Sequence, residues 1–98
     1  MARTAVRFHP AAAEEAEAAF RWYGQRSSTA AYGFREELQR AVDAVAQAPG
    51  RWPRYSTGAR RYIFPRFPFS LVYRLRDGDV EVVAVAHGRR RPGYWRSR

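Results

Sequence analysis

The sequence predicts an α+β fold in which an N-terminal strand and a two-helix hairpin pack on one face of an antiparallel β-sheet. Three observations predict this class. Apolar residues recur at helical spacing in the first half of the chain, strand-like runs fill the second half, and an Asp77-Gly78 pair separates the last two strands. With 98 residues the chain has room for one core, so we assign a single domain to residues 1–98.

The N-terminal half predicts one short strand followed by two helices. Residues 5–9 alternate as a half-buried strand does. Pro10 suits a first helical turn, so a helix is expected from there to Trp22. A break at Gly24 joins it to a second helix, and the Pro49-Gly50 pair ends that helix. The apolar stripe of the second helix consists of Phe34, Leu38, Ala41, Val42, Val45 and Ala48.

The C-terminal half predicts three strands, at residues 60–64, 69–76 and 79–87. Asp77-Gly78 is a strong signal for a two-residue hairpin loop, because a type I′ turn needs positive φ at both central positions. The turn therefore sets a register for the last two strands.

In this register Arg76 lies opposite Asp79 and Arg74 lies opposite Glu81, and opposite charges paired across strands support it. We expect His87 to point away from the helices, onto a shallow surface edged by arginine. The face expected to pack on the helices carries Phe69, Leu71, Tyr73, Leu75, Val80, Val82, Ala84 and Ala86.

The positive charge of the chain is one-sided. All 18 basic residues are arginine, and the formal net charge is +9. Residues 1–48 hold six arginines and six acidic residues, whereas residues 49–98 hold twelve arginines and three acidic residues. A field of this kind attracts polyanions such as nucleic acid, acidic protein segments or anionic lipid, and the alternative is a solvated surface that only maintains solubility.

The composition excludes several classes of site. There is no cysteine, so disulfides and thiolate chemistry are excluded. Two histidines without cysteine do not supply the ligands of a structural zinc site, and we expect no metal and no cofactor. The N-terminus lacks a secretory signal and the longest apolar run is too short to cross a bilayer, so no membrane association and a cytoplasmic location are expected.

The C-terminal segment combines arginines with a turn and two aromatic residues. Pro92 and Gly93 stand where a type II turn has proline and glycine. Such a turn would fold Tyr94 and Trp95 back over the body of the protein. Trp95 would then cap the core, and the Tyr94 hydroxyl could reach the His87 surface.

An imidazole, a phenol and several guanidinium groups therefore gather near the end of the last strand. Arginine binds phosphate oxygens in a fork, and His87 could transfer protons near neutral pH, so the set suits RNA cleavage without a metal. Two alternatives stay open: His87 is structural, or the arginines only bind a partner. His9, at a strand–helix junction, is interpreted as a local cap or surface residue.

Two segments, "RRYIFPRFPFSLVYRL" and "VAVAHGRRRPGYWRSR", and the order of elements resemble toxins of the RelE/ParE superfamily from bacterial type II toxin–antitoxin modules. The resemblance extends from about Val6 to Arg96. It implies a small α+β fold and a cognate acidic antitoxin that wraps the toxin, so a toxin–antitoxin hetero-oligomer is expected.

The activities of the superfamily divide into ribosome-dependent cleavage of messenger RNA and non-catalytic inhibition of DNA gyrase. In the nuclease interpretation, which we favour at this point, His87, Arg90 and Tyr94 are catalytic. Ser70 stands where nuclease members often have arginine, and the chain has no lysine, so two nuclease features are missing. Contacts with RNA or another target would come from Arg60, Arg61, Arg74, Arg89 and Arg91.

Overall fold

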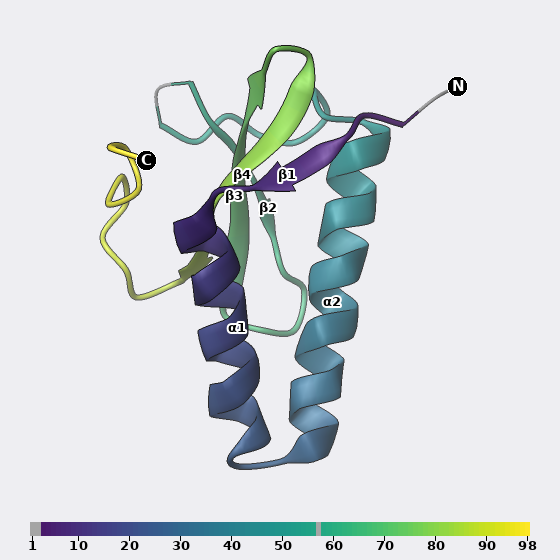
Figure 1. Cartoon of the computed structure of the whole chain (residues 1–98), viewed down its shortest axis with the longest axis vertical. Coiled ribbons are helices and arrows are strands. Elements are labelled where there is room, and N and C mark those ends of the chain that lie inside the picture. The colour runs from purple at the N-terminus through teal and green to yellow at the C-terminus, as the bar shows by residue number, and fades with distance from the viewer. Residues whose placement is uncertain (1–2, 57) are drawn as a thin grey trace.

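The computed structural model describes residues 3–56 and 58–98 of the chain. Over these residues it has two helices and four strands, which confirms the α+β class (Figure 1). In chain order the elements are β1 (Val6–Phe8), α1 (Pro10–Gly24), α2 (Ser28–Gln47), β2 (Arg60–Ile63), β3 (Phe69–Arg76) and β4 (Asp79–His87).

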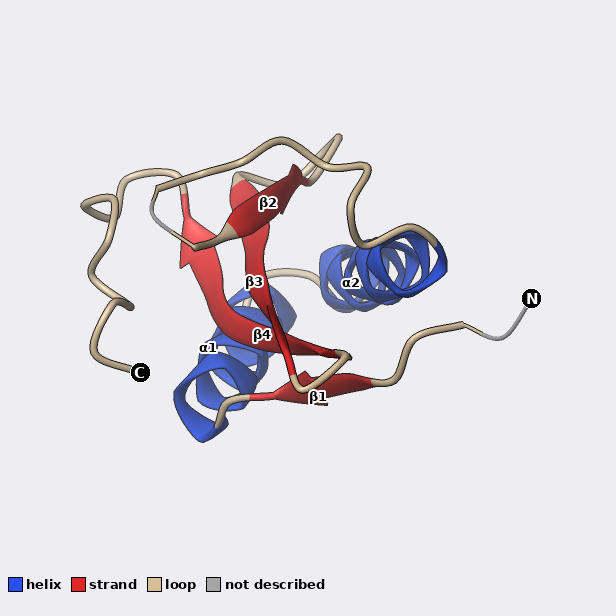
Figure 2. Ribbon diagram, turned by 90° about the horizontal axis from the view of Figure 1, so that it is seen from above, coloured by secondary structure: helices blue, strands red, loops and turns tan. Residues whose placement is uncertain are grey.

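The sheet has the strand order β1-β4-β3-β2. β2, β3 and β4 pair antiparallel, whereas β1 joins the edge parallel to β4, so the sheet is mixed rather than wholly antiparallel. Both helices lie on one face, called here the helix face, and the C-terminal tail (residues 88–98) lies along the opposite, outer face (Figure 2). Each face of the sheet therefore has its own cover.

Both helices begin at the caps that their sequences supply. The His9 Nδ1 accepts the Ala11 N–H at 3.1 Å and Pro10 opens α1, which confirms His9 as a capping residue. The Ser27 hydroxyl accepts the Ala30 N–H at 3.1 Å at the start of α2. The two helices pack on each other as the predicted hairpin.

The hairpin between β3 and β4 has the predicted turn. Asp77 has φ 53° and Gly78 has φ 81°, both positive as a type I′ turn requires. Arg76 pairs with Asp79 and Tyr73 with Val82, so the predicted register is correct as far as this pair.

Beyond that pair the register changes at a β-bulge. Val72 lies opposite Ala84, which leaves Val83 as an extra residue in β4. Because side chains alternate with a period of two, one extra residue moves every later side chain of β4 to the other face. Val85 and His87 consequently lie on the helix face, and the placement of His87 on the outer face was wrong.

Three further residues of the predicted helix face are corrected. Ala84 and Ala86 belong to the cluster on the outer face, because both follow the bulge. Leu75 is 57% exposed, because it lies next to the turn of a hairpin whose tip projects past the helices (Figure 1).

The sheet separates two apolar clusters. On the helix face, Phe34 of α2 and Leu71, Tyr73 and Val82 of the sheet are buried together with further aromatic rings. The outer cluster is smaller and consists of Ala59, Val72, Val83, Ala84 and Trp95, with Tyr55, Ala86 and Tyr94 partly buried beside it.

Candidate functional site

The C-terminal tail turns back on the sheet as its sequence predicts. Gly93 has φ +85°, and the Tyr94 N–H donates to the Arg91 carbonyl at 3.3 Å. A Cβ added at Gly93 would lie 2.9 Å from the Nε of the flexible Arg96 side chain, which can move aside, so the positive φ is what favours glycine here. The turn brings the Trp95 indole onto Val72, where it is 3% exposed and caps the outer cluster.

One carboxylate, Glu15 of α1, fixes this tail. Its Oε2 accepts the Tyr94 hydroxyl at 2.8 Å, and the Arg98 guanidinium donates to both oxygens, at 2.9 and 3.1 Å. Its Oε1 also accepts the Val85 N–H at 3.0 Å, from the part of β4 that follows the bulge. Glu15 therefore joins a helix, a strand and the tail.

This environment changes the acidity of the groups around Glu15. Burial, followed by the hydrogen bond to Glu15, raises the pKa of the Tyr94 hydroxyl well above its ordinary value. The same carboxylate raises the pKa of Arg98 through their hydrogen bonds. The phenol is consequently a protonated donor at neutral pH, committed to Glu15.

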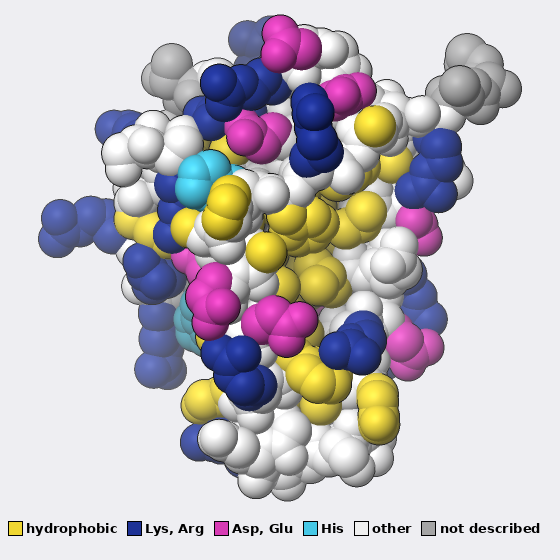
Figure 3. Space-filling view, viewed as in Figure 1, with side chains coloured by type: hydrophobic (Ala, Val, Ile, Leu, Met, Phe, Trp, Pro, Cys, Tyr) yellow, Lys and Arg dark blue, Asp and Glu magenta, His cyan; other side chains and the backbone are white. Residues whose placement is uncertain are grey.

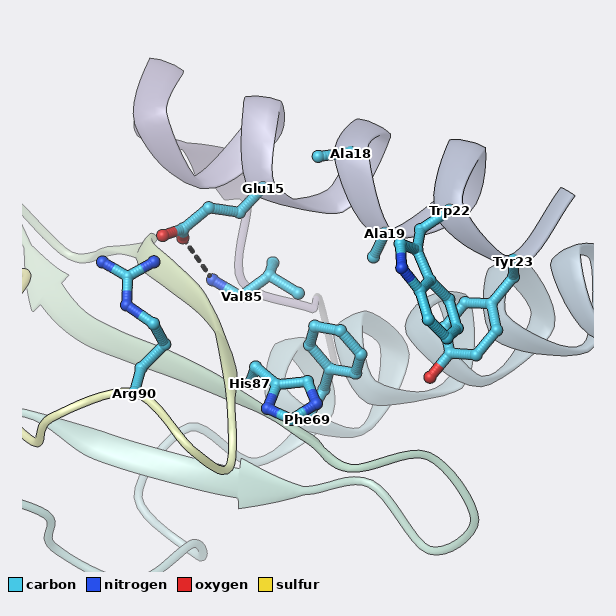
Figure 4. Close-up of a pocket in the computed structure, with 9 residues that line it drawn as sticks. All are labelled: Glu15, Ala18, Ala19, Trp22, Tyr23, Phe69, Val85, His87 and Arg90. Carbon is cyan, nitrogen blue, oxygen red and sulfur yellow. Dashed lines mark hydrogen bonds between the residues drawn. The ribbon is translucent and has the colours of Figure 1, made fainter. Parts of the chain in front are cut away.

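His87 lies beside an apolar groove on the helix face. The groove has a volume of about 300 Å³ and runs between α1 and the end of β4 (Figure 4). The imidazole meets the Phe69 ring edge-on, with centroids 5.1 Å apart. Its Nδ1 accepts the Arg89 N–H at 3.1 Å, so the neutral ring carries its proton on Nε2. The groove is lined by Glu15, Ala18, Ala19, Trp22, Tyr23, Phe69, Val85, His87 and Arg90.

Arg90 stands where the apolar groove meets a second hollow on the outer face. Its guanidinium lies 3.8 Å from the centre of the Tyr94 ring. Across the sheet the Arg61 guanidinium lies 4.0 Å from the centre of the Tyr55 ring. These four side chains and Arg91 line a hollow of about 290 Å³, which we call the basic recess.

The structure thus brings together several of the predicted site residues. His87, Arg90, Arg91, Tyr94 and Arg61 all line the basic recess. Arg89 is exposed in the same turn and is tied to His87 through its backbone N–H.

Arg60 and Arg74 lie apart from this group and have structural partners. Arg60 donates to the Trp52 carbonyl at 2.7 Å. Arg74 donates to Glu81 at 2.8 Å and to the Arg98 carbonyl at 2.7 Å, as its predicted cross-strand pairing with Glu81 required. Both line a separate pocket near Leu75.

Two contributors to the site were not found in the sequence. Glu15 lies within the first predicted helix, and its partner Tyr94 is 79 positions further along the chain. Tyr55 belongs to an irregular segment before β2. In neither case does the local sequence carry a signal, because the contact exists only after the tail has folded over the sheet.

Neither a metal site nor a membrane span is found in the described parts of the chain. Over residues 3–56 and 58–98, no group of three or more His, Asp or Glu side chains could hold a metal ion. No helix within those ranges is long and apolar enough to cross a membrane.

Comparison with known proteins gives a family match and a similarity to solved structures. Residues 6–92 match the family described as "ParE toxin of type II toxin-antitoxin system, parDE". The fold is similar to that of a chain from the "Chromosomal ParDE TA system from P. aeruginosa", with a TM-score of 0.75 and 17% sequence identity over 87% of this chain and 96% of that one. The sequence matches no curated protein.

Proposed function

Because the chain belongs to the ParE toxin family of type II toxin–antitoxin systems, we propose that it arrests growth by binding DNA gyrase, without catalysing a reaction. This proposal replaces cleavage of messenger RNA, which we favoured from the sequence, with the alternative considered there, inhibition of DNA gyrase. The family match and the geometry of the tail both support the change.

The observation that carries this proposal is the hydrogen bond from the Tyr94 hydroxyl to Glu15. A phenol that transfers protons to or from RNA needs a free hydroxyl and a pKa lowered toward neutrality. Here the hydroxyl is bound at 2.8 Å, and its pKa is raised. The residue is suited to holding the tail, and it is unsuited to acid–base catalysis.

The other two candidate catalytic residues have comparable structural roles. The His87 ring packs against Phe69 on the helix face, and its Nδ1 is occupied by a backbone donor. The Arg90 guanidinium stacks on the Tyr94 ring. With Ser70 in place of the arginine that nuclease members often have, the set lacks an assembled acid–base pair.

The surface around the tail suits a protein partner. The apolar groove adjoins arginines, and exposed aromatic and arginine side chains are the types enriched in protein interfaces. Trp22, at 51% exposed, carries the Arg26 guanidinium 3.6 Å from its ring centre. In Figure 3 arginines gather along the left edge, where Figure 1 places the tail, and acidic and basic side chains are mixed over the helices and the hairpin tip.

We further propose a cognate acidic antitoxin as the physiological partner, in a toxin–antitoxin complex. The net charge of +9 favours an acidic polypeptide. Part of the affinity would be electrostatic, so it should fall as ionic strength rises.

The proposal is tested by two assays on the same purified protein. In a supercoiling assay with DNA gyrase, relaxed plasmid and ATP, we expect inhibition that increases with toxin concentration. In a translating ribosome extract, primer extension on the messenger should reveal no new 3′ ends.

The variant His87→Ala separates the two mechanisms further. We expect it to retain inhibition of supercoiling, since the imidazole transfers no proton in a binding mechanism. New 3′ ends that disappear in His87→Ala and Arg90→Ala would overturn the proposal in favour of the nuclease. Undisturbed growth after induction would overturn both.

A further inference from the structure

The basic recess has an unusual construction for a surface pocket. Two cation–π pairs from distant segments line it, Arg61 over Tyr55 and Arg90 over Tyr94, at 4.0 and 3.8 Å. Stacking on a ring fixes the plane of a guanidinium and leaves the N–H groups at its edge available. Two pre-positioned forks therefore face one hollow.

The forks have no anion of their own within the described part of the chain. Side chains that line the recess include no aspartate or glutamate. Over residues 3–56 and 58–98, the guanidinium groups of Arg61, Arg90 and Arg91 make no hydrogen bond or ion pair. Arg74 and Arg98, by contrast, each have a carboxylate partner. Three unneutralised charges at one hollow favour an anionic ligand.

The shape of the recess favours a carboxylate over RNA. Recognition of single-stranded RNA relies on aromatic faces on which bases stack. Here the faces of Tyr55 and Tyr94 are taken by arginines, and Trp95 is 3% exposed. The volume of about 290 Å³ accommodates one or two short acidic side chains, and the buried Val72 forms part of its lining.

We propose that the basic recess binds a carboxylate side chain in an acidic segment of a protein partner. Arg61 and Arg90 each supply a planar fork that matches the two oxygens of a carboxylate, and the Ser70 hydroxyl lies in the same hollow. The proposal rests on the proposed function in one respect, because it assumes a protein partner. It adds the chemistry by which that partner is recognised.

The test titrates the full-length protein with N-acetylated, amidated hexaglutamate and, separately, with hexauridylate RNA. Binding is followed by the NMR resonances of the arginine Nε–H groups. We expect hexaglutamate to shift Arg61 and Arg90 and, because a charge-assisted hydrogen bond is lost, Arg61→Gln and Arg90→Gln each to weaken its binding by about tenfold.

Arg35→Gln is the matched control. The Arg35 guanidinium also stacks on a ring, at 3.9 Å from the centre of Phe20, but it lies on the helices. Its replacement removes the same charge and should change hexaglutamate affinity less than about twofold. Backbone amide spectra check that each variant keeps the fold.

Three results would overturn the proposal. The first is that hexaglutamate leaves the Nε–H resonances of Arg61 and Arg90 unshifted, and the second is that Arg35→Gln loses as much hexaglutamate affinity as Arg61→Gln. The third is that Arg61→Gln and Arg90→Gln lose more affinity for hexauridylate than for hexaglutamate. The last would assign the recess to RNA. The titration contains no gyrase, so a failed supercoiling assay leaves its outcome unaffected, and the two proposals fail separately.

Discussion

The two faces of the sheet are covered in different ways. The helix face is held by burial of large apolar groups, among them Phe34, Leu71 and Tyr73, each at most 1% exposed. The outer face is covered by an eleven-residue tail that buries one large side chain, Trp95, and is fixed by Glu15. A short segment can therefore stay on the face of a sheet although it buries little apolar surface, because a single carboxylate holds it by hydrogen bonds.

The same contrast appears between two carboxylates. Glu37, 2% exposed, accepts the backbone N–H groups of Arg66 and Phe67 at 2.8 and 3.3 Å, and the Arg66 Nε at 2.9 Å. It fixes the loop between β2 and β3 against α2. Glu15 fixes the tail through side-chain donors, Tyr94 and Arg98. Four substitutions measure how much each arrangement contributes to the stability of the fold.

The largest effect is expected from Phe34→Ala. The ring is 1% exposed and contacts four other aromatic rings, so its removal leaves a cavity in the helix-face core. We expect a loss of about 4–5 kcal/mol in the free energy of unfolding, measured by urea denaturation. Tyr32→Ala, at a side chain 61% exposed, is the control. A loss below about 1 kcal/mol at Phe34 would contradict the assignment of this core.

A smaller loss, about 3 kcal/mol, is expected from Trp95→Ala. The tail can leave the outer face without disrupting the helices, which limits the cost to that face. Hydrogen exchange should accordingly accelerate at the Arg96 and Arg98 amides, which are bonded within the tail, and stay unchanged in α2. If exchange accelerated throughout the molecule, the two faces would form one cooperative unit and the comparison would fail.

The third effect depends on pH. Burial raises the pKa of Glu37, but its hydrogen bonds with Arg66 and Phe67 outweigh burial and hold it below the ordinary value of 4.5. A lowered pKa means that the carboxylate stabilises the fold above pH 4.5 and that this contribution disappears as pH falls through the lowered value.

Glu37→Gln should therefore be less stable than the parent at pH 7 by about 2 kcal/mol, with the difference shrinking in acid. Denaturation midpoints from pH 7 down to pH 2 measure it, with the exposed Glu36→Gln as the control. A constant difference across this range would show that the effect is unrelated to charge.

The smallest effect is expected from Glu15→Gln, at about 1 kcal/mol, since the released tail groups regain water. One oxygen remains to accept a hydrogen bond, but the two-point contact with Arg98 is lost. The Tyr94 phenol should titrate at lower pH, followed by its ultraviolet absorbance. Glu17→Gln, on the exposed side of α1, is the control. An unchanged titration would show that Glu15 does not raise the pKa of Tyr94.

Much of the fold follows from local signals. Pro10 and the apolar stripe of the second helix predict α1 and α2, and Asp77-Gly78 predicts the hairpin with its first pairs in register. These signals act over a few residues, which is why the sequence reveals them.

The candidate site depended on features without a local signal. Residues Val82 to Ala86 are uniformly apolar, so neither side of β4 differs from the other in the sequence, and the bulge at Val83 leaves no mark. An error of one residue there reversed the assignment of His87. The Tyr94 contact with Glu15 spans most of the chain, and its consequence for proton transfer could not be foreseen from the basic residues beside it.

The extra residue at Val83 also bears on how related chains diverge. Deleting it would straighten the ladder, carry the imidazole at position 87 across the sheet, and shift the start of the tail by about 3.4 Å, one strand residue. In a family member whose fourth strand is one residue shorter, the side chain that ends this strand would then point to the outer face, away from the helices. Whether β4 has an odd or an even number of residues would thus determine on which side of its sheet a toxin of this family presents its arginines.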